Sequence, residues 1–165
     1  MQDCLSNQVK TQFQTFLFHL QNASQDGAED SIHQFRVTTK KIRAIGKALA
    51  FMLDEPDFAR ETLKPIRPVY KSGGNIRDLQ VLLGLVREYE GEGSGKYLEW
   101  EMFLAGQISV FKLKFYKAAK DLEETDLEEI QKAYSKAIQK PTEREFQTRL
   151  ALWFTALQEN IAQIL

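Results

Sequence analysis

A row of basic residues between positions 33 and 47 is the part of this sequence whose residue types and spacing could do chemistry. Its members are three or four residues apart, so on an α-helix at ~100° per residue they share an arc of roughly 80°. Their charged ends would follow one another at steps of ~5 Å along the axis, which suits an extended polyanion better than one compact anion. The row comprises His33, Arg36, Lys40, Arg43 and Lys47.

A second basic row follows at positions 60–71. Its members are separated by four, three and four residues, which predicts that they share one face of the next helix. The short connection at residues 54–56 implies an antiparallel pair of helices, in which both rows would border one groove. So many like charges repel one another unless a counter-anion is part of the design, although a solvated face is the ordinary alternative for one row alone. The second row comprises Arg60, Lys64, Arg67 and Lys71.

The charge distribution along the chain favours a localised anion site. The formal net charge is only −1, but residues 31–80 contain ten Lys and Arg against five Asp and Glu, which is +5. The rest of the chain contains twelve against eighteen, which is −6. A basic segment on an otherwise acidic protein predicts an anionic ligand at that segment.

Other kinds of chemistry have little support in these residues. Cys4 is a lone cysteine, and two separated histidines, His19 and His33, make a poor metal-ligand set. His33 could donate to a phosphate oxygen, or it could orient the first turn of its helix. No phosphate-binding loop or carboxylate cluster for Mg²⁺ accompanies it, so a catalytic role for His33 is weakly supported. We therefore expect no enzymatic activity, no cofactor and no metal.

The elements that must position these residues are predicted to be helices. Nine Gly and four Pro in 165 residues are too few for a many-stranded β fold. Apolar periodicity predicts a first helix ending near Asn22, a second from about Ser31 to Leu53, and a third from near Asp57 to about Tyr89. On the second helix, Phe35, Ile42, Ile45 and Leu49 lie opposite the basic row, which predicts that they enter a core.

Glycines and capping residues predict where the remaining elements begin and end. The pair Gly73-Gly74 predicts a kink or short break in the third helix, because two glycines cost roughly 2 kcal/mol of helix propensity. The Gly-rich residues 90–95 predict a loop. A long helix should follow from about Tyr97, and Thr125 and Thr142, each followed by Glu at the third position, predict two further helix starts.

The prediction is thus an all-α bundle of about six helices in one domain of residues 1–165. Its earlier half would be residues 1–90 and its later half residues 96–165. No apolar run approaches the roughly 18 residues of a membrane span, and no secretory signal is evident, so we expect a cytoplasmic protein.

Two separate motifs resemble the signature of the CHAD family, the conserved histidine α-helical domain. The first is His33-x-x-Arg36-Val37-x-x-Lys40-Lys41-x-Arg43, and the second is Ile76-Arg77-Asp78-Leu79-Gln80-Val81-Leu82. The resemblance implies a helical bundle with a basic surface cavity that binds inorganic polyphosphate. Some family members adjoin a triphosphate-processing catalytic domain. The resemblance assigns the anion-binding role to His33, Arg36, Lys40, Lys41, Arg43 and Arg77. The facial geometry of the rows adds Lys47, Lys64, Arg67 and Lys71.

The resemblance is clear over residues 28–90 and fades afterwards. No second His-x-x-Arg run follows the Gly-rich segment, and the lysines at positions 112–120 spread around their helix. Either the chain is a shortened member, or another copy supplies the missing half, which would make a homodimer.

We therefore predict non-catalytic binding of inorganic polyphosphate, or of phosphate and sulfate anions. One alternative is a nucleic-acid backbone binder, although the rows lack exposed aromatics for base stacking and the acidic remainder would repel a duplex. The other is a helical interaction module accessory to a triphosphate-processing enzyme.

Overall fold

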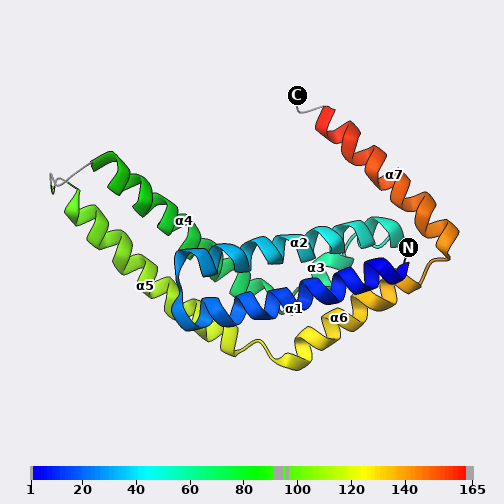
Figure 1. The fold of residues 1–165 in the computed structure, drawn as a ribbon, viewed down its shortest axis with the longest axis horizontal. Helices are drawn as coiled ribbons and strands as arrows, with labels where there is room; N and C mark the ends of the chain where they lie inside the picture. Colours follow the sequence, from blue (N-terminus) through cyan, green and yellow to red (C-terminus); the bar gives the residue numbers. More distant parts are fainter. Residues whose placement is uncertain (1, 91–94, 96, 163–165) are drawn as a thin grey trace. The chain divides into compact units, whose positions relative to one another are not determined.

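The fold is all-α, as predicted. The structure is a computed structural model that describes residues 2–90, 95 and 97–162. Within these residues it contains seven helices and no strand (Figure 1). None of the described helices is both long enough and apolar enough to span a membrane. The helices are α1 (Gln2–Asp26), α2 (Glu29–Leu53), α3 (Phe58–Thr62), α4 (Arg67–Glu90), α5 (Leu98–Lys120), α6 (Glu124–Gln139) and α7 (Glu143–Ala162).

The chain forms two compact units that interleave along the sequence. Unit 1 comprises Met1–Thr15, Lys40–Lys64 and Glu124–Leu165. Unit 2 comprises Phe16–Thr39 and Pro65–Glu123. Helices α1 and α2 therefore each contribute one part to unit 1 and the other part to unit 2. Neither unit is a continuous segment of sequence.

The core of unit 1 surrounds Tyr134 of α6, which is fully buried. The rings of Phe13 and Phe58 lie with their centroids 5.5 Å and 5.6 Å from that of Tyr134. The Tyr134 hydroxyl donates a hydrogen bond of 3.2 Å to the carbonyl oxygen of Ile42. Burial raises the pKa of this hydroxyl well above its usual value. A buried hydroxyl needs such an acceptor, which places α6 against α2 within this unit.

The core of unit 2 surrounds Phe35 of α2. Its ring lies between those of Phe16 and Phe115, with centroid distances of 5.5 Å and 5.4 Å. Gly73 of α4 packs against the same rings, because a Cβ there would lie 3.1 Å from Cε1 of Phe35. Helix α4 is continuous through Gly73 and Gly74, so the predicted short break does not occur there. These glycines permit close approach of α2 and α4, and tertiary packing outweighs their low helix propensity.

The predicted third helix is interrupted before the glycine pair, between Thr62 and Arg67. It therefore forms two helices, α3 and α4, so the described residues contain seven helices where about six were predicted. Helix α3 ends at Thr62 and α4 begins at Arg67. Pro65 lies between them and cannot donate a backbone hydrogen bond, and it disfavours the helical conformation of the residue before it. The predicted single face for the second basic row is therefore wrong. Arg60 lies on α3, Lys64 lies in the connection, and Arg67 and Lys71 lie on α4.

Most other helix ends lie close to their predicted positions, for local reasons. Helix α1 continues four residues beyond Asn22 to Asp26, and Gly27 follows with a left-handed φ of 54°. Helix α2 ends at Leu53 as predicted. Thr142 and Glu145 form the predicted capping box, with the Glu145 carboxylate accepting from the Thr142 amide at 2.9 Å. Helix α6 begins at Glu124, which confirms the predicted start near Thr125, although Thr125 itself lies inside the helix and is therefore not its N-cap.

Two predictions about the organisation of the chain stay predictions. The predicted Gly-rich loop of residues 90–95 begins at Glu90, the last residue of α4, and its residues 91–94 lie outside the described residues. The single-domain organisation, with its earlier and later halves, stays a prediction.

Candidate anion-binding site

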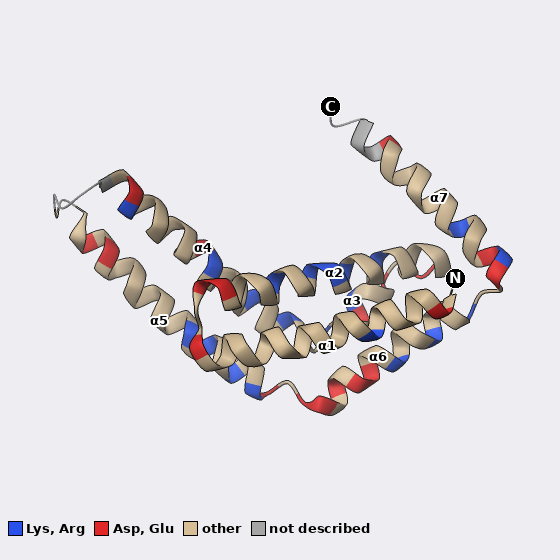
Figure 2. Ribbon diagram, in the orientation of Figure 1, with Lys and Arg blue, Asp and Glu red and all other residues tan. Residues whose placement is uncertain are grey.

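Lys and Arg residues recur along α2 (Figure 2), and the apolar residues on the opposite side of the helix are buried. Phe35, Ile42 and Leu49 are at most 1% exposed, as the predicted core face requires, and Ile45 is half-buried. On the other side His33 is exposed, and Arg36, which follows it by one turn, is half-buried. The apolar face of the helix is therefore buried as predicted, and the role of the opposite residues as a basic binding face stays a prediction.

Arg36 is held in position by two residues of α4 within unit 2. Its guanidinium carbon lies 5.2 Å from the centroid of the Tyr70 ring, a distance at which the ring quadrupole attracts a cation. Its Nη1 atom occupies the space that a side chain at position 74 would fill, because a Cβ on Gly74 would lie 2.5 Å from it. Tyr70 and Gly74 thus form a seat for the planar guanidinium.

Arg77 is also brought against α2, but a carboxylate holds it there. Its Nη1 atom donates to Oε1 of Glu29, in the first turn of α2, and forms an ion pair with it. The Arg77 side chain is 25% exposed and that of Glu29 is 61% exposed. A bound anion at Arg77 would compete with Glu29, because both present oxygen acceptors to the same guanidinium.

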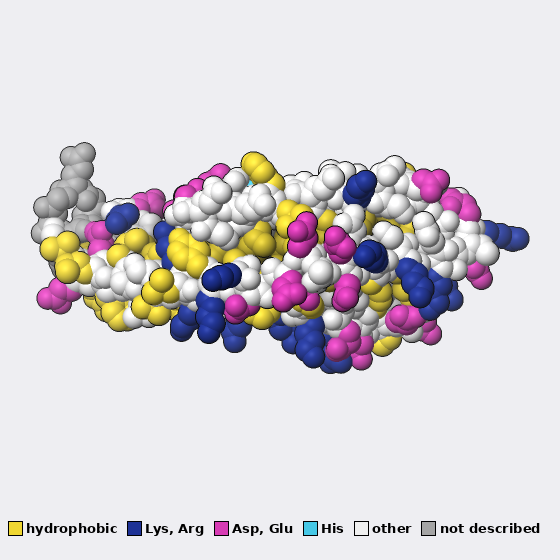
Figure 3. All heavy atoms as spheres, turned by 90° about the horizontal axis from the view of Figure 1, so that it is seen from below, with side chains coloured by type: hydrophobic (Ala, Val, Ile, Leu, Met, Phe, Trp, Pro, Cys, Tyr) yellow, Lys and Arg dark blue, Asp and Glu magenta, His cyan; other side chains and the backbone are white. Residues whose placement is uncertain are grey.

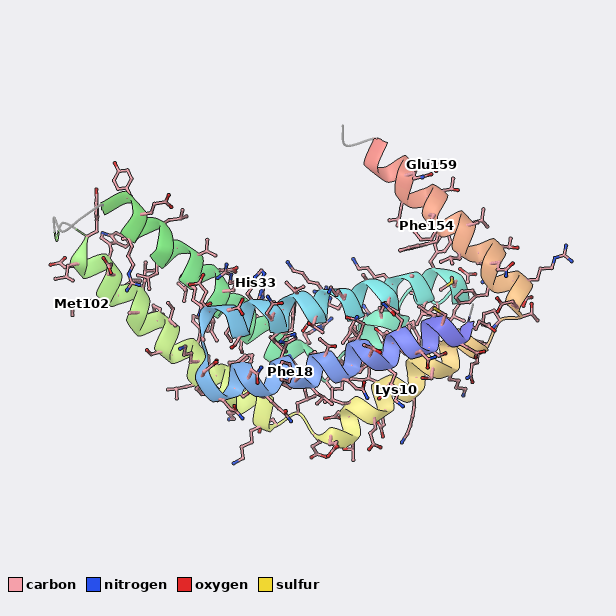
Figure 4. All side chains as sticks on the ribbon, in the orientation of Figure 1. Lys10, Phe18, His33, Met102, Phe154 and Glu159 are labelled. Carbon is pink, nitrogen blue, oxygen red and sulfur yellow. The ribbon has the colours of Figure 1, made fainter. Side chains whose placement is uncertain are left out.

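The contacts in unit 2 show that α2 and α4 run antiparallel there. Glu29 meets Arg77, and later on α2 Arg36 meets Tyr70 and Gly74, which come earlier on α4. His33 lies on this part of α2 (Figure 4). Arg67 and Lys71 are exposed on α4. The predicted antiparallel packing of the two helices is therefore present in unit 2 for α2 and α4, and the groove shared by their basic residues stays a prediction.

Unit 1 contains the other predicted residues. Lys40, Lys41, Arg43 and Lys47 are exposed on α2, and Lys64 is exposed in the connection after α3. Lys47 and Arg149 of α7 both line a surface hollow of about 590 Å³ within this unit. Arg149 is held there by a hydrogen bond of 2.5 Å to the carbonyl oxygen of Met52.

The comparisons with known proteins bear on this arrangement. The model of the CHAD domain family matches residues 7–164 of the chain. The chain belongs to the CHAD family. The match covers the later helices as well as the two motifs, so the family likeness extends beyond residues 28–90, where the motifs alone placed it. No curated protein and no solved structure matches this CHAD domain.

Sequence reasoning missed four residues that shape the site of this CHAD domain. Tyr70 and Gly74 seat Arg36, Glu29 pairs with Arg77, and Arg149 joins Lys47. Tyr70 and Gly74 share a face of α4 with Lys71, at helical spacing, and this was the available signal. No sequence pattern pointed to Glu29 or Arg149, because Glu29 lies 48 residues from Arg77 and Arg149 lies 102 residues from Lys47.

Proposed function

We propose that this CHAD domain binds inorganic polyphosphate, or a similar linear phosphate polymer, without altering it. The observation that carries the proposal is the seat of Arg36. An arginine packed on Tyr70 and against Gly74 has lost rotamer freedom before any ligand arrives, so less entropy is lost on binding. Its outward N–H groups suit the paired oxygens of a phosphate.

The neighbouring cations support a polymeric ligand over a single phosphate. His33 lies one turn before Arg36, and Arg67 and Lys71 are exposed on the helix that seats it. These three residues form no ion pair within the part of the chain that the structure describes. Cations held on two antiparallel helices repel one another, and a chain of phosphates would relieve that repulsion at several points.

Unit 1 has its own set of residues to which we assign phosphate contacts. This set comprises Lys40, Lys41, Arg43, Lys47 and Lys64, the exposed basic residues described above. Lysines present compact and mobile charges, so we expect these contacts to add affinity with little geometric selection.

Titration of the full chain with long-chain polyphosphate tests the proposal. Because binding would release counterions, we expect the affinity to fall steeply between about 50 mM and 200 mM salt. Arg36→Ala should weaken binding by ~1–3 kcal/mol. Arg36→Lys keeps the charge but loses the planar fork, so it should recover only part of this loss. Lys132→Ala, an exposed position paired with Glu128, is the matched control and should bind as the wild type does.

The same assay separates the alternatives. Polyphosphate, single-stranded RNA and duplex DNA are titrated in parallel under one salt condition. Equal or tighter binding of a nucleic acid would replace the proposal with a backbone-binding function. If no anion binds, an accessory interaction module becomes the preferred function. The non-catalytic part of the proposal predicts that no orthophosphate is released from polyphosphate in the presence of Mg²⁺.

A further inference from the structure

The outer side of the α4–α5 pair in unit 2 is unusually apolar. Figure 3 shows hydrophobic side chains over the α4–α5 pair, at the left of the view. Six large apolar residues of α5 are exposed, and together they present about 600 Å² per chain at roughly 150–200 Å² for each fully exposed side chain. The largest apolar patch of a typical monomer is already ~300–600 Å² and is often functional. The six are Leu98, Trp100, Met102, Phe103, Val110 and Leu113.

Four of these residues, Met102, Phe103, Val110 and Leu113, lie within ~60° of Gly106 around the helix, whereas Leu98 and Trp100 lie ~80° and ~120° from it. Leu104, Ile108 and Phe115 of α5 are buried, and at ~100° per residue Gly106 lies directly opposite the centre of that buried set. Met102 extends away from the body of the pair (Figure 4). A Cβ on Gly106 would meet no atom within 4 Å, so the centre of the outer face is open and flat. Such a face accepts a second helix at close range.

The charges that bracket this face are opposite in sign. Glu99 lies at its N-terminal end and Lys117 at its C-terminal end, within ~20° of Gly106 around the helix. Neither forms an ion pair with any residue that the structure describes. An antiparallel partner with the same sequence would place each Glu99 beside the other Lys117. The face is thus complementary to itself, which is the requirement of a two-fold interface.

The side-chain sizes obey the same symmetry. If Glu99 opposes Lys117, the two-fold axis passes near position 108, Phe103 opposes Leu113, and Gly106 opposes Val110. The side chain of Val110 from one copy would then fill the space left by Gly106 of the other, as a knob fills a hole. Met102, Phe103, Val110 and Leu113 present roughly 400 Å² at ~150–200 Å² for each fully exposed side chain, which is about half of the ~800 Å² per partner of a standard interface, and flanking polar residues would supply the rest.

We propose that α5 is a dimerisation helix, and that two copies of this chain pack α5 against α5 in antiparallel orientation about an axis near position 108. A second copy fits better than a lipid surface, because Glu88 and Glu99 at one end of the pair would repel an anionic bilayer. The inference stands apart from the proposed function, since no phosphate ligand is involved.

Sedimentation of the full chain without polyphosphate tests the dimer. The wild type should sediment as two copies of the 19.0 kDa chain over about 1–100 µM, a range typical of association measurements. Val110→Glu places an acid beside the axis and should raise the dimer dissociation constant at least ~100-fold. Val81→Glu is the matched control, since Val81 of α4 is exposed to nearly the same extent, 43% against 45%. It should leave the dimer intact, and circular dichroism should show unchanged helix content in both variants.

Charge reversal tests the orientation. Glu99→Lys alone and Lys117→Glu alone should each weaken the dimer, and the double variant should restore it, because only an antiparallel pair joins the two positions. A monomeric wild type, a dimer unaffected by Val110→Glu, or single reversals without effect would each overturn the proposal. Co-sedimentation of the wild type with anionic or neutral vesicles, lost in Val110→Glu, would identify lipid as the occupant and would also overturn it.

Discussion

Replacing Gly74 by Ala adds one methyl group to α4 at the place where the Arg36 guanidinium packs. The new Cβ would lie 2.5 Å from Nη1 of Arg36, so that atom must move. Because Nη1 is the end of a long flexible side chain, the movement needs no change in the backbone. The guanidinium would leave the Tyr70 ring and the cation–π contact of about 0.5–1 kcal/mol would be lost.

The expected change in stability follows from two opposing contributions. Ala in place of Gly in a helix interior stabilises by about 0.8–1 kcal/mol, which nearly cancels the lost contact with Tyr70. Gly74→Ala should therefore have a free energy of unfolding close to that of the wild type. Gly84→Ala is the matched control on the same helix, because its Cβ would meet nothing within 4 Å. Its free energy of unfolding should rise by the whole ~1 kcal/mol, which corresponds to an increase of about 2–4 °C in Tm.

A third variant calibrates the series. A Cβ at Gly73 would press on Phe35, whose ring is confined between Phe16 and Phe115 and cannot yield freely. Overpacking of this kind costs about 1–3 kcal/mol, so Gly73→Ala should be less stable than the wild type despite its better helix propensity.

Thermal and urea denaturation, followed by circular dichroism at one protein concentration, measure the series, and polyphosphate titration measures the site. Gly74→Ala should bind more weakly while Gly84→Ala binds normally. If Gly74→Ala instead matched Gly84→Ala in both stability and affinity, the reasoning about the seat of Arg36 would be refuted.

Three further predictions concern single side chains. Glu29→Gln releases Arg77 from its ion pair, so it should tighten polyphosphate binding while costing at most ~1 kcal/mol of stability; unchanged affinity in the titration would remove Arg77 from the site. Gln80 is buried on α4, and among the described residues its Oε1 atom has no hydrogen-bond donor. Gln80→Met should therefore raise the free energy of unfolding by about 1 kcal/mol in urea denaturation, and a loss of stability would contradict this. Burial raises the pKa of Tyr134, so the folded chain keeps this proton above about pH 10 whereas the unfolded chain releases it. Stability should then fall as pH rises above ~10, by up to ~1.4 kcal/mol per pH unit from this group, and Tyr134→Phe should show a shallower fall between pH 9 and 11.

Local patterns made much of the fold predictable from the sequence. The period of Phe35, Ile42 and Leu49 is a property of one helix, so it correctly predicted the buried face of α2. The stop at Leu53 and the capping box of Thr142 are likewise local, since each depends on residues within one turn.

Features that depend on tertiary contacts were not predictable. Gly73 and Gly74 looked like a helix break because their role, close contact with Phe35 and Arg36, is visible only when α2 lies against α4. The helix break at Pro65 was not predicted, because the helical spacing of the basic residues continues on both sides of this proline. The helical spacing of Tyr70 and Gly74 indicated a shared face on α4, but it did not indicate that this face would meet Arg36, which lies 34 residues before Tyr70. Whether the basic residues bind phosphate is a question for the titrations.

The interleaving of the two units sets an order of events during synthesis. All of unit 2 is encoded within the first 123 residues, so Arg36 can meet Tyr70 on a nascent chain. The Gln2 amide, in contrast, donates to the carbonyl oxygens of Ile138 and Pro141 at 2.8 Å, and those acceptors are synthesised after all of unit 2. At ~5–20 residues per second, Ile138 and Pro141 are synthesised about one to four seconds after Glu123, the last residue of unit 2. The start of α1 therefore waits that much longer for its partners than the end of α1 does. During this interval a chaperone could recognise the apolar side of its first fifteen residues.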